Sequence, residues 1–448
     1  MSLSFKGGVH PPESKHLSEN QPIKVMKPPE VVYIPLSQHA GAPSKPLVKR
    51  GDRVLLGQTI GEDTGFISAK IHSSVSGTVQ KIGPYPHPIT GKQESTIIIE
   101  NDGKDERAEE LEVYGENWRD IDPSKVAEIV KNAGVVGMGG AAFPAHVKLS
   151  PPASKEIDTV LLNGAECEPF LTADHRLMLE FPEDILNGLE IIGKVIGAKR
   201  LAVCIEENKP DAIEVMRERA KGTSIEIIPL KVKYPQGAEK QMINAVTGRE
   251  VPSGGLPFDA GCYVQNVGTS KAIYDAISRG LSLYERVVTV SGPVIKNPSN
   301  LMIRVGTPYS DIIDECGGPT ETVYKVISGG PMMGLAQSNM EVPVTKGTSG
   351  ILLFGVKDAP SRPEMACINC AKCVDICPMF LMPTRIAAAI EYDDVDFAEK
   401  LGTMDCIECG SCSFICPSDR RLLHYIRLAK NKIWEKRAKE KKNRIETN

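Results

Sequence analysis

The sequence lacks the features that would place this chain within a membrane or mark it for export. No run approaches the roughly 20 consecutive apolar residues that a membrane-spanning helix needs. The opening residues, Met1 to Gly8, contain no apolar signal core. Neither sign of charge dominates, since 53 Lys and Arg residues stand against 57 Asp and Glu residues. That balance provides no general attraction to nucleic acid or anionic lipid. We therefore expect a soluble chain that can still dock on a membrane partner.

The twelve cysteines also lack the pattern of a disulfide framework. Four are scattered singly: Cys167, Cys204, Cys262 and Cys316. The other eight form two matching runs, each reading C-x2-C-x2-C-x3-C-P. This spacing is typical of paired 4Fe–4S clusters, in which the fourth cysteine of each run binds the other cluster. Structural zinc is the alternative, but zinc usually takes C-x2-C pairs totalling four ligands.

The exchange of fourth ligands predicts two centres with defined cysteines. One centre takes Cys367, Cys370, Cys373 and Cys416, and the other takes Cys406, Cys409, Cys412 and Cys377. Two such clusters indicate one-electron transfer. Oxygen-sensitive clusters and unpaired thiols favour a reducing compartment, the cytoplasm.

Strand and helix patterns predict a multidomain chain of α/β and β classes. We expect domains over residues 1–105, 106–285, 286–355 and 356–448, and a length of 448 residues accommodates them. The first alternates short strands with Gly, Pro and Asp turns, over 31–35, 53–56, 59–60, 77–82 and 95–100. Its words Val48-Lys-Arg-Gly-Asp-Arg-Val and Ser74-Val-Ser-Gly-Thr-Val resemble the biotinyl/lipoyl barrel-sandwich fold. Lys70 has no acidic neighbour, so we interpret this domain as a scaffold. An acidic, helix-prone linker follows at 104–113.

The second domain alternates apolar strands with amphipathic helices. Residues 159–162, 201–206 and 224–232 are strand candidates, and 183–196 and 210–220 show helical spacing. This order predicts a parallel sheet, which binds ligands beyond the carboxyl ends of its strands. Residues 286–355 return to short strands and resemble the soluble-ligand-binding β-grasp module. Helical stretches at 383–391 and 395–400 predict a helical double-cluster domain.

The most glycine-dense stretch runs from Gly134 to Lys148. Gly137-x-Gly139-x-x-Ala142 has the form of a dinucleotide fingerprint, but such a fingerprint follows a strand, whereas residues 124–131 have a helical pattern. Glycines still let backbone amides approach a phosphate or a flat ring closely. The alternative is a plain glycine loop.

Further words follow in a defined order: Asn163-Gly-Ala-Glu166-Cys-Glu168-Pro169, Asp174-His-Arg176, Tyr234-Pro-Gln-Gly237-Ala-Glu239 and Gln265-Asn266-Val267-Gly268-Thr269. This series resembles the flavin subunit of respiratory NADH dehydrogenase. It is more similar to a relative of that subunit, the RnfC component of the Rnf complex, a membrane ferredoxin–NAD oxidoreductase. The opening Gly7-Gly-Val-His-Pro-Pro-Glu-Ser-Lys matches as well, so the resemblance covers nearly the whole chain.

The resemblance implies noncovalent FMN that exchanges a hydride with NAD(H). FMN would be bound by Gly137, Gly139, Gly140, Lys148, Asn163, Asn266 and Thr269, with Lys148 at the phosphate. Glu166 and Glu168 would lie near the nicotinamide and its ribose, and Tyr234 and Glu239 beside the nucleotide. For each residue, a helix cap or turn role is the alternative. Ala165 stands where NADH dehydrogenase usually has Asp, and Ala238 replaces the first of its paired glutamates, which weakens the expectation of an NAD pocket.

These features predict the NAD(H)-side electron-transfer subunit of a membrane-associated complex that translocates ions. Its partners would be the other Rnf-type subunits and NAD(H), with no nucleic acid, and it would lie peripherally at the cytoplasmic face of the cell membrane. A soluble flavin/iron–sulfur reductase of the cobalamin reductase type is one alternative. A cluster relay with a degenerate NAD site is another. His146 and His175 are interpreted as polar lining, because a flavin that accepts hydride needs no general base. The nine Lys and Arg residues of 427–444 are interpreted as a solvated helix face, with a docking surface as the alternative.

Overall fold

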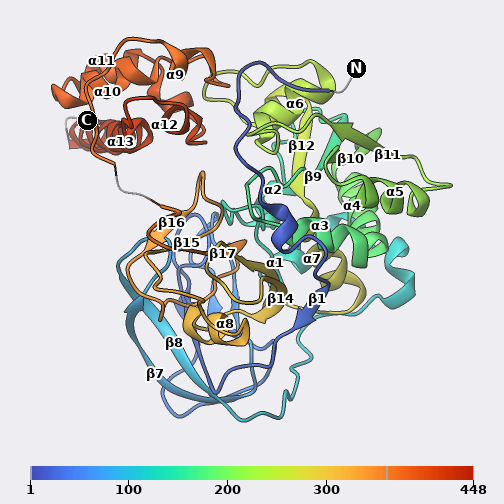
Figure 1. Cartoon of the computed structure of the whole chain (residues 1–448). Coiled ribbons are helices and arrows are strands. Elements are labelled where there is room, and N and C mark those ends of the chain that lie inside the picture. The colour runs from blue at the N-terminus through green and yellow to red at the C-terminus, as the bar shows by residue number, and fades with distance from the viewer. Residues whose placement is uncertain (1–2, 360–361, 447–448) are drawn as a thin grey trace. The chain divides into compact units, whose positions relative to one another are not determined.

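The computed structural model describes residues 3–359 and 362–446, and the chain divides into two compact units. One unit comprises Glu13–Pro229 and Gly261–Ala359, and we call it the flavin unit because it holds the expected flavin motifs. The other comprises Met1–Pro12, Leu230–Ala260 and Pro360–Asn448, and we call it the cluster unit. Residues 230–260, expected in the α/β domain, thus group with the cysteine runs. Figure 1 traces the elements of both units.

The first domain of the flavin unit consists of two antiparallel sheets around one core. Val32, Ile97, Ile60 and Ile71 are fully buried between them. All five expected strand regions contain strands. One sheet has the order β2 (Val31–Pro35), β8 (Gln93–Asn101), β7 (Gly77–Pro86) and β4 (Arg53–Val54), and the other β3 (Lys45–Pro46), β5 (Thr59–Glu62) and β6 (Ile71–His72).

The linker at 104–113 is not helical, contrary to the expectation. The Leu56 amide donates to the Glu106 carbonyl at 2.8 Å, and the Ala108 amide to the Leu56 carbonyl at 2.9 Å. The Glu110 carboxylate accepts from the amide and the hydroxyl of Thr59. The linker's backbone and acidic groups are therefore bonded to the first domain, which outweighs its local helix propensity.

The second domain contains a four-stranded sheet with the order β11 (Ile225–Leu230), β10 (Arg200–Glu206), β9 (Thr159–Gly164) and β12 (Cys262–Asn266). Strand β9 is parallel to both of its neighbours, as expected. The accompanying helices are α1 (Pro123–Asn132), α2 (Ala145–Lys148), α3 (Ala173–Glu180), α4 (Pro182–Ile196), α5 (Pro210–Arg219) and α7 (Val267–Ser278). Helices α4 and α7 touch at Gly188, where an added Cβ would lie 2.1 Å from the Ser270 carbonyl oxygen.

The third domain contains a six-stranded sheet, and one of its strands comes from far upstream in the sequence. Its order is β1 (Ile23–Val25), β14 (Ser299–Arg304), β13 (Glu285–Ser291), β17 (Gly350–Phe354), β15 (Lys325–Ser328) and β16 (Leu335–Gln337), with α8 (Tyr309–Glu315) in the same segment. Short strands were expected here, but the pairing of β1 with β14 was not, because three residues carry too little pattern.

The cluster unit is helical, as predicted. Its helices are α6 (Glu239–Thr247), α9 (Lys372–Asp375), α10 (Pro383–Glu391), α11 (Val395–Lys400), α12 (Ser411–Phe414) and α13 (Leu422–Glu446). Helices α10 and α11 have the expected bounds. The N-terminal segment packs against the first cysteine run, since the Gly8 amide donates to the Ile376 carbonyl at 2.8 Å. Gly7 has φ +84°, and a Cβ there would lie 2.9 Å from the Ile376 oxygen, so only glycine fits.

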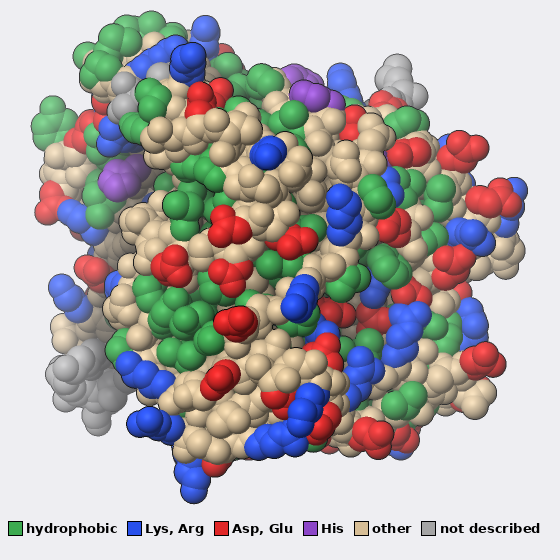
Figure 2. Space-filling view, turned by 60° about the horizontal axis from the view of Figure 1, so that its bottom comes forward, with side chains coloured by type: hydrophobic (Ala, Val, Ile, Leu, Met, Phe, Trp, Pro, Cys, Tyr) green, Lys and Arg blue, Asp and Glu red, His purple; other side chains and the backbone are tan. Residues whose placement is uncertain are grey.

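No helix in the described ranges is long and apolar enough to cross a membrane. Acidic and basic side chains are interspersed on the face drawn in Figure 2. This mixture agrees with the net charge of −4.

Candidate functional site

The carboxyl ends of β9 and β12 define the candidate site. The chain continues from β9 to β10 on one side of the sheet, while β12 pairs on the other side, so the strand order reverses between β9 and β12. Open α/β sheets bind ligands at such a reversal. The parallel register places Asn163 opposite Asn266, and both residues were predicted FMN ligands.

The glycine loop joins this strand end through two contacts. The Met138 amide donates to the buried Thr269 Oγ1 at 2.8 Å, and a Cβ on Gly139 would lie 3.4 Å from the Asn266 Cβ. Gly140 has φ +114°, and a Cβ there would meet nothing within 4 Å. Gly139 and Gly140 are exposed. The loop therefore presents bare backbone to open space, an arrangement that suits a phosphate or a flat ring.

The Asn266 side chain links three elements of the site. Its Oδ1 accepts from the amides of Gly268 and Thr269 at the start of α7, at 2.8 and 3.3 Å. Its Nδ2 donates to Asp174 Oδ2 at 2.7 Å. Burial, and then the charge of Glu166, raise the pKa of Asp174 to about 7. Asn266, a predicted FMN ligand, thus also caps the start of α7.

Lys148 lies at the end of α2, with its Nζ 5.7 Å from the ring centre of Tyr263. Gln265 follows Tyr263 by two residues on β12, so the two side chains share a face of the strand. The Gln265 Nε2 atom is buried and has no hydrogen-bond partner among the described residues. A buried donor without a partner calls for an explanation, and a bound group that accepts its hydrogen bond is one. Sequence reasoning gave Gln265 no role, because its orphaned amide is visible only in three dimensions.

The carboxylates of Glu166 and Glu168 bind backbone amides. Glu166 has φ +47° and accepts from the amides of Asp174 and His175, at 2.7 and 3.2 Å, in the first turn of α3. Glu168 accepts from the amides of Met332 and Met333, at 3.0 and 2.9 Å, after β15. Their contact with nicotinamide and ribose stays a prediction, and in the structure both side chains fix the loop that follows β9.

Two buried lysines hold the same loop by its carbonyl groups. Lys15 Nζ donates to the carbonyls of Glu166, Glu168 and Leu171, at 2.8, 2.9 and 2.6 Å. Lys209 Nζ donates to the Ala165 carbonyl at 2.7 Å. Burial, and then the charge of Lys209, lower the pKa of Lys15. Sequence reasoning had placed Lys15 in the opening motif without a role, since its acceptors lie some 150 residues away along the chain.

The eight run cysteines gather into two groups in the cluster unit. A cavity of about 110 Å³ is lined by Cys367, Cys370, Cys373 and Cys416, together with Thr384 and Arg420. In the second group, burial and then the nearby Cys406, Cys409 and Cys377 raise the pKa of the Cys412 thiol. The last cysteine of each run thus lies with the first three of the other. No three His, Cys, Asp or Glu side chains in the described residues are close enough to bind a single metal ion.

Known families match four stretches that make up most of the chain. The RnfC barrel sandwich hybrid domain matches residues 3–104, the Nuo51 FMN-binding domain 130–275, the SLBB domain 287–336 and the 4Fe-4S dicluster domain 359–417. The C component of the proton-translocating ferredoxin:NAD(+) oxidoreductase complex of Clostridium ljungdahlii is 50% identical over 96% of this chain and 94% of that protein. The chain belongs to the RnfC family.

Other RnfC relatives are nearly as similar. The C component of the Na(+)-translocating ferredoxin:NAD(+) oxidoreductase complex of Acetobacterium woodii is 48% identical over 97% of this chain and 98% of its own length. The C component of the ion-translocating oxidoreductase complex of Rhodobacter capsulatus is 43% identical over 98% and 85%. These matches confirm the family expected from the motifs, and the four domain matches confirm its overall domain content.

Tyr234 and Glu239, expected beside the nucleotide, both lie in the cluster unit of this RnfC protein. The buried Tyr234 donates its hydroxyl hydrogen to the Cys409 carbonyl at 2.8 Å. Glu239 begins α6, where Gln241 Nε2 donates to the Pro378 carbonyl at 3.2 Å. In the structure this segment supports the backbone around the cysteine runs. A role beside the nucleotide stays a prediction.

The basic C-terminal helix of this RnfC chain is paired within its own unit. Lys436 Nζ lies 2.6 Å from Asp396 and 3.0 Å from Glu399, and Lys430 Nζ lies 2.8 Å from Glu408. Several charges of α13 are therefore balanced by neighbouring acidic groups, which favours the interpretation of a solvated helix face over a docking surface.

Proposed function

We propose that this chain is the NAD(H)-side electron-transfer subunit of a membrane-associated ferredoxin–NAD oxidoreductase. It passes electrons between NADH, FMN and two 4Fe–4S clusters, and its partner subunits couple that transfer to ion translocation. The observation that carries the proposal is 50% identity to a component of such a complex over 96% of the chain. We place the chain at the cytoplasmic face of the cell membrane, bound there through its partners.

FMN would lie at the ends of β9 and β12. The amides of the loop containing Gly137, Gly139 and Gly140 would face it, and Asn163, Asn266 and Thr269 would border it. Lys148 would neutralise the phosphate, and we add the orphan amide of Gln265 as a donor. Flavin accepts a hydride and gives up single electrons, chemistry that the protein positions and does not itself supply.

The clusters would be bound by Cys367, Cys370, Cys373 and Cys416, and by Cys406, Cys409, Cys412 and Cys377. Thiolate is the ligand form. Four thiols gathered in one place repel each other when ionised, and a cluster cation core removes that cost. Tyr234 would hold the loop of the second centre through the Cys409 carbonyl.

NAD(H) would approach the loop that follows β9. Lys15 and Lys209 draw the carbonyls of this loop inward. In a trans peptide the N–H group points opposite to the carbonyl, so the amides of Glu166 and Cys167 turn away from these lysines. Pro169 has no N–H, and the Thr172 amide donates to Thr289 Oγ1 at 3.0 Å. Outward amides suit an anionic or amide-bearing ligand. Glu166 and Glu168 would act mainly by fixing this loop.

A cluster relay without NAD chemistry is the second candidate. The observation that favours it is that the carboxylates of Glu166 and Glu168 are already bonded to backbone amides. A relay would be reduced by a low-potential donor but would not respond to NADH.

An anaerobic visible spectrum decides between the two candidates. The purified protein should release FMN on acid treatment and contain about eight irons, as two cubanes require. NADH should bleach the flavin absorbance. If NADH bleached nothing in protein with full cofactor content, the relay would replace the proposal.

The flavin loop has its own test. Gly139→Val places a branched side chain against Asn266 and between backbone and cofactor. FMN content should be lost while iron content stays near normal. Full FMN in this variant would refute the assignment of the loop.

A further inference from the structure

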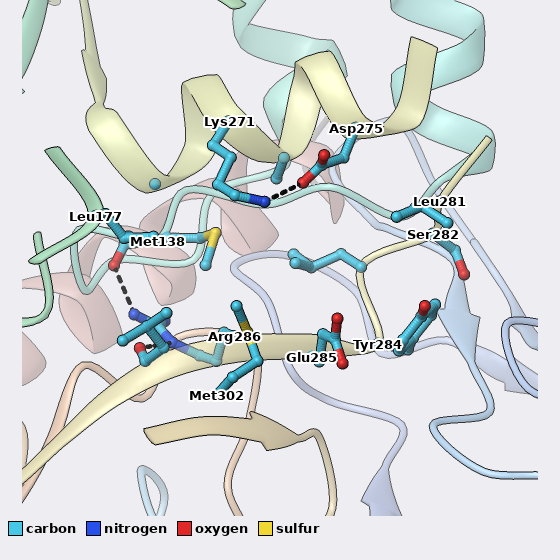
Figure 3. A pocket seen from close by; sticks show the side chains of 14 residues that line it. Met138, Leu177, Lys271, Asp275, Leu281, Ser282, Tyr284, Glu285, Arg286 and Met302 are labelled. Carbon is cyan, nitrogen blue, oxygen red and sulfur yellow. Dashed lines mark hydrogen bonds and ion pairs between the residues drawn. The ribbon is translucent and has the colours of Figure 1, made fainter. Parts of the chain in front are cut away.

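Two buried basic side chains of the third domain hold the carbonyl groups of the glycine loop. Arg286 belongs to β13 and is 3% exposed, and Lys346 precedes β17 and is 1% exposed. The Arg286 guanidinium donates to the Met138 carbonyl at 3.4 Å and to the Lys346 carbonyl at 2.6 Å. Lys346 Nζ donates to the Gly134 carbonyl at 2.7 Å. Figure 3 shows Arg286 reaching from its strand to the Met138 carbonyl oxygen.

Neither side chain forms a hydrogen bond to a carboxylate in the described part of the chain, and burial lowers the pKa of Lys346 to about 7. The acceptors of Arg286 are the carbonyls of Val287, Lys346 and Met138, and those of Lys346 are the carbonyls of Lys70 and Gly134. A buried charge without a paired opposite charge is costly. Burial lowers the pKa of Arg286 to about 10, so its guanidinium stays protonated at neutral pH. The charge of Asp174 acts on this guanidinium without a hydrogen bond between the two side chains, and the cation also favours a further negative charge that forms nearby.

The geometry of the Met138 peptide gives this cation a direct effect on the loop. The amide of Met138 is fixed by Thr269 and its carbonyl by Arg286. Because the N–H of a trans peptide points opposite to its carbonyl, the Gly139 amide points away from Arg286. Gly139 is exposed, and its amide has no partner among the residues that the structure describes. A donor is thus held ready on the ligand side, with a positive charge behind it.

We propose that Arg286 is a positioning residue of the flavin site that also sets the flavin potential. It fixes the Gly139 amide toward the cofactor, and its charge stabilises the reduced form. Hydride transfer from NADH breaks a C–H bond of the nicotinamide and brings two electrons and one proton to the flavin. The flavin thereby gains one negative charge, which the guanidinium offsets. The inference rests on the proposed binding of FMN at this loop, and it assigns the third domain an electrostatic task in the flavin site.

The test compares Arg286→Gln with Arg286→Lys and Arg304→Gln. Arg304, on the neighbouring strand β14, is bonded to Asp105 at 3.1 Å and to Glu285 at 3.5 Å, so its charge is already compensated. FMN content is measured first, and then the flavin midpoint potential by spectroelectrochemistry. Arg286→Gln should shift the flavin potential to a more negative value and leave the cluster signals unchanged. Arg286→Lys should restore most of the potential, and Arg304→Gln should leave it unaltered.

The outcomes separate this inference from the proposed function. A wild-type flavin potential in Arg286→Gln would overturn the inference. If Arg286→Gln failed to hold FMN, a normal flavin potential in Arg286→Lys would support the role of the positive charge. Loss of FMN in Arg286→Lys as well would show that the site needs the shape of the arginine side chain, and it would overturn the inference. If Gly139→Val retained FMN, the flavin site itself would be misplaced, which is a different failure.

Discussion

At the scale of single residues, buried cations fix the two loops of the candidate site through their carbonyl groups. Lys15 and Lys209 hold the loop after β9, and Arg286 and Lys346 hold the glycine loop. A lysine that donates to three carbonyls fills its whole donor capacity. Removing such a lysine leaves buried carbonyl acceptors without partners, so the loop that carries these carbonyls is destabilised.

Lys15→Met should therefore loosen the loop after β9. Three carbonyls lose their donor at about 1–3 kcal/mol each, so we expect a loss of at least about 3 kcal/mol in the free energy of unfolding. The measurement is the urea midpoint at which the protein releases its flavin. Lys27→Met, at an exposed lysine, is the matched control and should leave the midpoint unchanged. Equal midpoints in the two variants would show that the three hydrogen bonds contribute little.

Asp174 should make stability depend on pH near neutrality. Burial and the charge of Glu166 raise its pKa from 3.8 to about 7 in the folded chain. Between these values the folded state keeps a proton that the unfolded state has released, so stability falls as pH rises from about 4 to about 7. Asp174→Asn keeps the contact with Asn266 and should remove this part of the slope. Denaturation midpoints of both proteins at several pH values test it, and parallel slopes would contradict the assignment.

At the scale of elements, the two cysteine runs repeat one arrangement. In each run a short helix, α9 or α12, follows the second cysteine, and the fourth cysteine lies with the other run's first three. The two groups differ in exposure. Cys370 is exposed, whereas Cys377, Cys409 and Cys412 are buried. The centre of Cys367, Cys370, Cys373 and Cys416 is thus the more accessible one.

The exchange of ligands makes Cys377→Ser and Cys416→Ser a reciprocal pair. Cys377→Ser should damage the centre of Cys406, Cys409 and Cys412, although Cys377 is nearer in sequence to the other run. Cys416→Ser should damage the centre that contains Cys370. Electron paramagnetic resonance of the reduced variants separates the two signals. If each variant lost the centre of its own run, the ligand assignment would be wrong.

At the scale of the whole molecule, the sequence patterns predicted which domains are present, but they predicted few of the contacts between distant residues. The parallel sheet and the helical cluster domain follow from periodicity, which is local, whereas the grouping of Asn163 with Asn266 was implied by the family resemblance. The roles of Lys15 and Arg286 do not follow from the sequence patterns. A lysine or arginine side chain can donate to any backbone carbonyl, and only the fold determines which carbonyls lie near it. The assignment of residues 230–260 to the cluster unit also depends on long-range packing.

The division of labour between the units predicts an order of electron transfer. NADH should bleach the flavin first and the clusters afterwards, because the proposed FMN site lies in the flavin unit and the proposed clusters lie in the cluster unit. Anaerobic stopped-flow absorbance follows both the flavin and the cluster signals.

Glu166→Ala removes the cap on α3 that holds the loop after β9. It should slow flavin bleaching by NADH roughly tenfold to a hundredfold, as loss of about 1–3 kcal/mol implies, while dithionite still reduces the flavin fully. Cys377→Ser is the matched control, since it removes a cluster ligand and should change the flavin phase by less than about twofold. Bleaching of the clusters ahead of the flavin would place NADH entry elsewhere in the chain.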